Sequence, residues 1–284
     1  MAVFYNQATL SYGNNVTNSN IVTGELLEVL SMTKTSLGNE YGAGNDVVYA
    51  VSIVNSGTTA FTDLTVTDDL GAFPFGAGTL TPLDYVSGSA VLYVNGVLQA
   101  APAVTAGPPL VISGLTVPAG GTALLLYRAL PNNFAPLGVD STITNTATVT
   151  GGGLSTALTD SQTITAVEAP RLTISKSMCP TTVVENGTLT YTFVIENLGN
   201  TPAVATDNLT VTDTFLPILS NLAVTLDGAV LTEPADYTYN TTTGEFASVA
   251  GRITVPAATY ATDPVTGAVT VTPGVAILRI TGTV

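Results

Sequence analysis

The chain contains two lysines, Lys34 and Lys176, and their positions indicate unusual chemistry. Each lies in a segment where apolar residues alternate with Ser or Thr, a pattern typical of a half-buried strand. Each lysine takes an apolar position of that alternation, two residues after Met32 in one segment and two after Ile174 in the other. The pattern predicts that both ammonium groups point into a hydrophobic core, where an unpaired charge is very costly. The alternative is that both are ordinary solvated lysines.

Two aspartates and two asparagines are the expected partners of these lysines. The motif Leu-Thr-Val-Thr-Asp occurs twice and ends at Asp68 and at Asp213, both on the apolar side of their alternation. Asn145 and Asn6 lie in two further segments that resemble each other, again among the residues expected to face inward. Because buried polar groups need partners, the simplest interpretation is a buried Lys–Asp ion pair bridged by Asn.

A more specific chemical interpretation of the same residue types is a spontaneous isopeptide bond between Lys and Asn. Burial lowers the pKa of a lysine and leaves a neutral amine nucleophile. Burial raises the pKa of an aspartate, and the protonated acid can polarise the Asn carboxamide by hydrogen bonding. The amine attacks the carboxamide carbon, ammonia leaves, and fixed geometry supplies the proximity that an uncatalysed exchange lacks. Asp68 and Asp213 are the expected promoting residues, and no other catalytic activity is expected.

An internal repeat positions these residues. Lys34 and Tyr49 are separated by the same interval as Lys176 and Tyr191, and the Leu-Thr-Val-Thr-Asp motif follows in both copies. Short Thr- and Val-rich runs with closely spaced turn residues predict an all-β chain of two tandem immunoglobulin-like β-sandwiches. We expect residues 26–165 to form the first sandwich and residues 166–284 to form the second.

The hairpin turns of the two copies also match. Asn95-Gly96 in the first copy and Asp227-Gly228 in the second are two-residue turn signals suited to a β-hairpin.

The second copy ends before its last strand, and a segment that resembles this strand stands at the N-terminus. The first copy continues through an inward set of Ile143, Asn145, Ala147 and Val149 after the point where the second copy stops. The N-terminal segment carries a corresponding inward set: Phe4, Asn6, Ala8 and Leu10. We therefore expect residues 1–25 to be a donor strand and linker. The alternative is a loose arm, or an arm that folds back on its own chain.

A sandwich without its last strand exposes unpaired backbone groups and a hydrophobic slot. Such a slot is commonly filled by a strand from another chain. A donor at one end and a slot at the other give a heterologous contact, which forms an open filament if the rotation does not close. The predicted partner is therefore another copy of this chain, in a head-to-tail homopolymer, with Lys34 joined to Asn145 inside one chain and Lys176 joined to Asn6 of the neighbour.

Composition excludes several classes of function. A net charge of −14 argues against nucleic acid as a partner. The chain has no histidine, which excludes His-based catalysis and His–metal sites, and we expect neither a metal nor a cofactor. No apolar run is long enough for a transmembrane helix. The one cysteine, Cys179, rules out an intramolecular disulfide and could pair between subunits.

The lysine on a first strand, Tyr-x5-Asn, Leu-Thr-Val-Thr-Asp and Asn-x-Ala-x-Val together resemble the bacterial Ig-like conserved repeat domain, a surface-protein repeat family of unknown function. The Lys/Asp/Asn triad is also similar to that of the isopeptide-forming domains of Gram-positive adhesins and pilins. This resemblance implies the triads Lys34, Asp68 and Asn145, and Lys176, Asp213 and the Asn6 of a neighbour. The chain departs from those proteins in lacking a sortase signal and a visible Sec signal peptide, which favours a spore appendage or another non-Sec fibre over wall anchoring.

Two functions are consistent with these patterns. The first is the structural subunit of an extracellular or spore-surface fibre that assembles itself by donor-strand complementation. The second is a fragment of a multidomain bacterial adhesin or surface stalk that binds a ligand. Self-assembly of the purified subunit distinguishes the first from the second.

Overall fold

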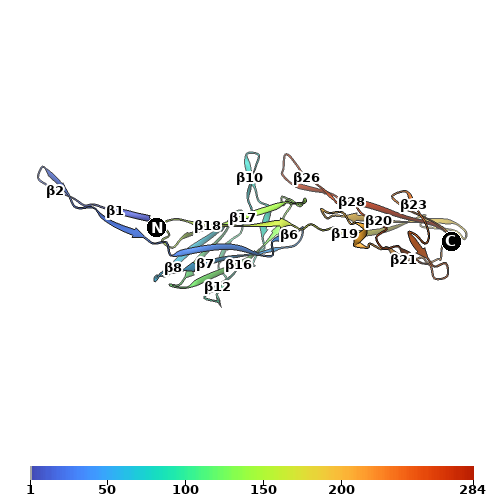
Figure 1. Cartoon of the computed structure of the whole chain (residues 1–284), viewed down its shortest axis with the longest axis horizontal. Coiled ribbons are helices and arrows are strands. Elements are labelled where there is room, and N and C mark those ends of the chain that lie inside the picture. Colours follow the sequence, from blue (N-terminus) through green and yellow to red (C-terminus); the bar gives the residue numbers. More distant parts are fainter. Residues whose placement is uncertain (1) are drawn as a thin grey trace.

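The computed structural model describes residues 2–284, without the side chain of Ala2, and these residues are almost entirely β-strands and turns. Buried apolar side chains form two separate clusters, one between Leu30 and Ala166 and one between Leu189 and Ile280. Each cluster lies between packed β-sheets, and the two sandwiches follow one another along the long axis of the molecule (Figure 1). The predicted all-β fold of two tandem immunoglobulin-like sandwiches is confirmed. We call them the first and the second sandwich.

Two six-stranded sheets build the first sandwich, and their Thr-, Val- and aromatic-rich strands suit a pleated, half-buried surface. One sheet has the order β13 (Val97–Leu98), β12 (Val91–Val94), β16 (Thr122–Pro131), β7 (Val47–Asn55), β5 (Leu30–Leu37), with β11 (Leu83–Tyr85) also on β16. The other has the order β14 (Ala103–Thr105), β15 (Leu110–Val117), β8 (Phe61–Asp68), β17 (Thr142–Gly151), β18 (Leu158–Ala166), β6 (Glu40–Tyr41). A small hairpin of β9 (Phe73–Phe75) and β10 (Gly78–Leu80) projects from it.

The second sandwich has fewer strands. Its larger sheet has the order β19 (Leu172–Cys179), β20 (Thr188–Asn197), β28 (Gly274–Thr283), β22 (Ser220–Leu226), β23 (Ala229–Leu231). Its smaller sheet has the order β21 (Thr212–Thr214), β25 (Glu245–Ser248), β24 (Tyr237–Tyr239), and a 3-10 turn, η1 (Ala205–Asp207), precedes it. A hairpin of β26 (Thr259–Thr262) and β27 (Val269–Thr272) reaches back to the first sandwich, where the Val269 N–H donates to the Asn133 carbonyl at 2.7 Å.

The strand registers of the two sandwiches agree with the internal repeat. Tyr49 on β7 pairs with Tyr127 on β16, and Tyr191 on β20 pairs with Ile280 on β28. Both Asn-Gly and Asp-Gly turns form hairpins, with positive φ at both turn residues, as a type I′ turn requires.

An asparagine has the same role in both copies of the repeat, at the end of β7 in the first sandwich and at the end of β20 in the second. Asn55 donates its side-chain N–H to the carbonyls of Thr59 and Pro118 and accepts from the Gly57 N–H. Asn197 makes the same set of contacts in the second sandwich, to Thr201, Pro256 and Gly199. Each asparagine therefore fastens two loops at one end of its sandwich.

The two sandwiches differ at one strand. In the first, β8 is flanked by β15 on one side and by β17 on the other, with Asp68 opposite Ala147. In the second, β21 corresponds to the end of β8 and pairs with β25, and within residues 2–284 no strand takes the place of β17. In the single chain, β21 therefore has an unpaired edge on the side where β8 pairs with β17.

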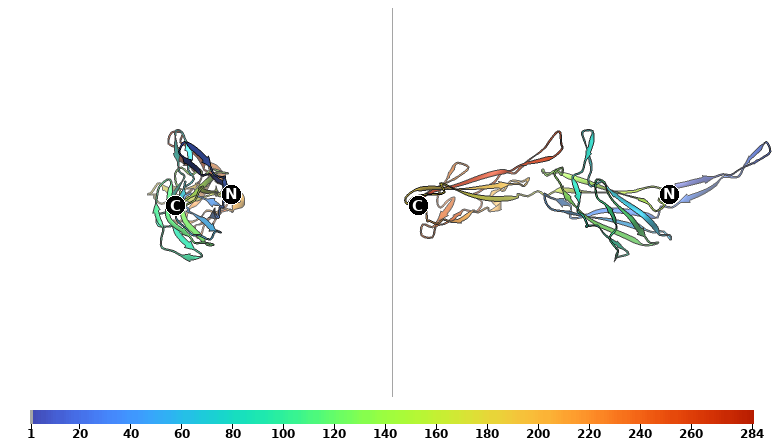
Figure 2. Two further views of the ribbon diagram at one scale, coloured as in Figure 1. Left: turned by 90° about the vertical axis from the view of Figure 1, so that its left-hand side faces the viewer. Right: turned by 180° about the vertical axis from the view of Figure 1, so that it is seen from behind.

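The N-terminal segment is a two-stranded hairpin rather than the single strand expected from its sequence. Strand β1 (Ala2–Asn6) pairs with β4 (Val22–Leu26), and β2 (Thr9–Tyr12) pairs with β3 (Asn15–Asn18). The hairpin projects from the first sandwich, away from the second (Figures 1 and 2). We call it the N-terminal hairpin. Its large apolar side chains are exposed: Val3, Phe4, Tyr5, Leu10, Tyr12, Val16, Ile21, Val22 and Leu26.

Candidate functional site

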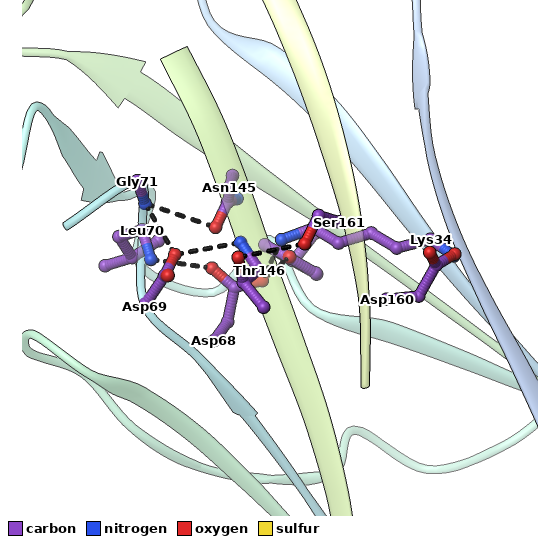
Figure 3. A network of polar contacts seen from close by, with 10 residues as sticks. Lys34, Asp68, Asp69, Leu70, Gly71, Asn145, Thr146, Asp160 and Ser161 are labelled. Atoms are coloured by element: carbon purple, nitrogen blue, oxygen red, sulfur yellow. Dashed lines mark hydrogen bonds and ion pairs between the residues drawn. The ribbon is translucent and has the colours of Figure 1, made fainter. Parts of the chain in front are cut away.

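A buried polar cluster occupies the middle of the first sandwich. Lys34, Asp68 and Asn145 are 2%, 1% and 0% exposed, and they come from β5, β8 and β17. Lys34 Nζ lies 2.5 Å from Asp68 Oδ2 and 4.9 Å from the centre of the Tyr49 ring. Figure 3 shows Lys34 reaching across the sandwich toward Asp68, with Asn145 on the strand next to it. The structure thus pairs Lys34 with Asp68 directly and buries Asn145 in the same core, on β17, the strand next to that of Asp68.

Asp68 accepts hydrogen bonds from two further donors besides Lys34. The Tyr127 hydroxyl donates to the same oxygen, Oδ2, and the Leu70 N–H donates to Oδ1 at 2.9 Å. Because a buried carboxylate needs its acceptor sites filled, this set of donors holds Asp68 in one orientation. The role of Tyr127 was not predicted from the sequence, because an inward tyrosine is also an ordinary core residue.

Asn145 is incompletely satisfied. Its Oδ1 accepts the Gly71 N–H at 3.2 Å, but its Nδ2 has no hydrogen-bond partner among residues 2–284. The buried Tyr49 hydroxyl likewise has none in that range. The two side chains form no hydrogen bond with each other, since both polar atoms are without a partner in that range. The Asn145 Nδ2 is therefore a buried donor that no hydrogen bond within residues 2–284 satisfies.

Burial controls the ionisation of this cluster. Removal from water lowers the pKa of Lys34, and its ion pair with Asp68 opposes that shift without cancelling it. Burial also raises the pKa of Tyr127 well above its usual value, and the nearby Asp68 raises it further. Tyr127 therefore stays a hydroxyl donor, and Lys34 is closer to its neutral, nucleophilic form than a solvated lysine.

Strand β18 also contacts the lysine strand. The Lys34 N–H donates to Asp160 Oδ2 at 2.7 Å, although β5 and β18 are not paired as strands. Asp160 thus joins the two sheets along the edge where they meet. No feature of the sequence indicated that Asp160 would contact Lys34.

The corresponding cluster of the second sandwich is open to solvent. Lys176 Nζ forms an ion pair with Asp213 and lies 4.5 Å from the centre of the Tyr191 ring, as its counterpart lies over Tyr49. The Lys176 side chain is 41% exposed and that of Asp213 is 17% exposed. The prediction that Lys176 points into a core is therefore not met in the single chain, because the strands that cover Lys34 have no counterpart here.

Two hollows lie beside this open cluster. One is lined by Asp213, Tyr239 and Phe246, and the other by apolar residues of β19, β20 and the segment before β21. Ile174, at the second hollow, is 57% exposed, whereas its counterpart Met32 is partly buried. The second sandwich therefore exposes an apolar surface, whereas in the first sandwich the matching surface is covered by that sandwich's own strands.

The remaining predicted residues lie away from both clusters. Asn6 and Phe4 are on β1, Leu10 is on β2 and Ala8 lies between these strands, all exposed in the N-terminal hairpin. Cys179 is a free, exposed thiol at the end of β19. Residues 2–284 contain no cluster of three potential metal ligands, and no helix in that range is long and apolar enough to cross a membrane.

Replacing Tyr127 by Phe is expected to lower the free energy of unfolding by about 1–3 kcal/mol, because Asp68 loses a buried hydrogen-bond donor. Chemical denaturation of the two proteins measures the difference. Tyr93→Phe is the matched control, since this partly buried tyrosine of the same sheet has no hydroxyl contact in the described residues. Equal losses in both variants would mean that the Tyr127–Asp68 contact contributes nothing.

No family model and no curated protein sequence matches the chain, so membership of the conserved repeat family stays a prediction. Several solved structures are similar in fold at low identity. The major pilin subunit BcpA of Bacillus cereus shares 11% identity with a TM-score of 0.36, over 96% of this chain and 73% of that chain. A fragment of the major pilin GBS80 of Streptococcus agalactiae shares 11% at 0.35, over 79% of each chain. The collagen-binding domain of a Staphylococcus aureus adhesin shares 13% at 0.31, over 50% of this chain and 99% of that one.

Proposed function

We propose that this chain is the structural subunit of an extracellular fibre on a cell or spore surface, assembled head-to-tail by strand donation. The observation that carries the proposal is a pair of unpartnered elements at opposite ends of one molecule (Figure 1). The N-terminal hairpin exposes large apolar side chains at one end, and β21 has an open edge beside exposed apolar residues of β19 at the other. Exposed apolar surface next to unpaired strand edges is the condition for β-strand addition.

The first sandwich supplies the template for the register. Asp68 on β8 is opposite Ala147, and Asn145 lies two residues before Ala147 on β17. With the same register, Ala8 of a neighbour lies opposite Asp213 and Asn6 reaches Lys176. A shift of one residue would turn Asn6 outward and Tyr5 inward, so the apolar pattern fixes the pairing.

Assembly by the chain alone is the first test of this function. The purified subunit is expected to form fibres without other factors, which negative-stain electron microscopy detects. A monodisperse monomer at high concentration would contradict the proposal and favour a piece of a longer surface protein.

The polar cluster of the first sandwich is proposed to form an internal isopeptide bond. Lys34 Nζ attacks Asn145 Cγ, the Cγ–Nδ2 bond breaks, and the amide nitrogen leaves as ammonia after taking up the proton that the amine loses. Asp68 is within reach of the attacking amine and relays that proton. The lowered pKa of Lys34 and the unpartnered Nδ2 of Asn145 support this step.

The mass of the intact subunit tests this bond. Wild-type protein is expected to weigh one ammonia less than its sequence, and Asp68→Asn to have the full mass, since a carboxamide cannot relay the proton. Asp68→Ala is expected to destabilise the fold by about 3–5 kcal/mol in addition, because it leaves a buried amine without a partner. A wild-type mass equal to that calculated from the sequence would mean that the cluster is only an ion-pair network.

A further inference from the structure

We propose that the donated element is the whole N-terminal hairpin, and that its second strand, β3 and β4, covers β19 of the neighbouring subunit and encloses Lys176. This inference rests on the proposed function and deepens it, since strand addition alone requires only β1 and β2. It assigns the outer edge of the second sandwich as a docking surface for a second copy of this chain.

The first sandwich shows what encloses a lysine of this type. Its β17 pairs with β8 on one side and with β18 on the other, so that β17 and β18 form a hairpin of their own. Strand β18 packs beside β5 and buries its Ile164 and Ala166 completely or almost completely. Through Asp160 it also binds the backbone of Lys34. Pairing of β17 completes the sheet, but β18 is what covers the strand that carries the lysine.

The second sandwich lacks both strands. Its β19 corresponds to β5, and its inward residues are exposed where those of β5 are not: Leu172 is 37% exposed, whereas Leu30 is buried. A single donated strand beside β21 would restore the counterpart of β17. It would leave β19 without a counterpart of β18, and Lys176 would stay in contact with water.

The N-terminal hairpin has the architecture of the β17–β18 hairpin. Asn6 is opposite Val22, as Asn145 is opposite Gln162, and opposite residues of a strand pair lie on one face. Val22 and Leu26 therefore share the face of Asn6, while the polar Thr23 and Glu25 lie on the other. Strand β4 is thus apolar on the side that would meet the neighbour, whereas β3 places Thr17 opposite Leu10 on that side.

The position of the Phe4 side chain also favours donation of both strands. It is opposite Gly24, and a Cβ placed on Gly24 would come within 2.3 Å of the Phe4 ring. The ring thus lies across the second strand, at the position where Ile143 is opposite Ile164 in the first sandwich. In the docked hairpin, the Phe4 ring fills the space that Ile143 and Ile164 fill together in the first sandwich. It can do so only when β4 lies beside β1.

The connections are compatible with this placement. Residues 27–29 join β4 to β5, and residues 167–171 join β18 to β19. A donated hairpin would therefore lead into the next first sandwich much as β18 leads into the second sandwich within one chain. The fibre becomes a row of sandwiches, each closed by the hairpin that precedes the next.

Lysine acylation gives a direct test, because Lys34 and Lys176 are the only lysines. The acceptor is a variant that lacks residues 1–26, which is expected to fold because the buried cluster of the first sandwich begins at Leu30. It is mixed with a synthetic peptide of residues 1–12 or of residues 1–26, both with Asn6→Ala so that no covalent bond consumes the amine. Peptide mapping by mass spectrometry then reports acylation at Lys176, with the buried Lys34 as internal control.

Both peptides are expected to bind, but only the 1–26 peptide to protect Lys176 from acylation. Equal protection by the 1–12 peptide would overturn the inference and leave single-strand donation intact. Binding of the 1–26 peptide without protection would also overturn it. Failure of both peptides to bind would instead contradict the proposed function itself.

Discussion

Deletion of residues 1–12 is expected to abolish fibre formation and to leave the first sandwich folded. The deletion removes β1 and β2, which carry Phe4, Asn6 and Leu10, and these have no contact with the buried cluster of the first sandwich. That sandwich supplies its own last strands, β17 and β18. Electron microscopy of the purified variant measures assembly, and thermal unfolding measures the fold.

A peptide of residues 1–26 provides the control for this deletion. Added to the variant, it is expected to occupy the open edge at β21 and raise the melting temperature of the second sandwich, since a ligand that binds only the folded state stabilises it. Fibres of normal length from the deletion variant would contradict strand donation. A peptide in which Phe4 and Leu10 are replaced by Asp should give no stabilisation.

Wild-type fibres are expected to survive boiling in detergent as a covalent polymer. In the register of the first sandwich, Asn6 of one subunit would meet Lys176 of the next with Asp213 beside it, and the reaction proposed for Lys34 and Asn145 would be repeated between chains. Enclosure of Lys176 on docking would supply the burial that the single chain lacks. Denaturing gel electrophoresis measures the effect, which should be complete.

Lys176→Ala and Asn6→Ala separate this bond from docking. Both variants are expected to form fibres, because the apolar side chains of the hairpin remain, but these fibres should fall to monomers on the gel. Wild-type fibres that already dissociate to monomers would rule out the bond. Dissociation only after addition of a reductant would assign the cross-link to the exposed Cys179 instead.

Much of the first site could be predicted from the sequence because strand alternation assigns each residue to a face. Lys34, Asp68 and Asn145 all break an apolar pattern at an inward position, and an inward polar residue needs a partner in the same core. Lys34 and Asp68 do form such a pair, and Asn145 is buried on the strand next to that of Asp68. The repeat gave the register, since matching intervals place matching residues at matching positions.

The contributions of Tyr127 and Asp160 could not be predicted in the same way. An inward tyrosine is also an ordinary core residue, and only the pairing of β16 with β7 places its hydroxyl at Asp68. Asp160 reaches Lys34 across two sheets that no local pattern relates. The second strand of the N-terminal hairpin was missed because its apolar residues alternate less regularly than those of the first.

The exposure of Lys176 could not be predicted from the alternation pattern alone. The same alternation that buries Lys34 leaves Lys176 41% exposed, because burial depends on strands that the second sandwich does not contain. The sequence repeat predicts Lys176 and its partner Asp213, but the strands that would bury this pair are not part of the second sandwich.

An electron cryomicroscopy structure of the fibre formed by the purified chain tests the central claim most directly. We expect the N-terminal hairpin of each subunit beside β21 and β19 of the next, with Ala8 opposite Asp213 and continuous density between Asn6 and Lys176. Fibres in which the hairpin projects into solvent, or packs on its own chain while β21 stays unpaired, would contradict it.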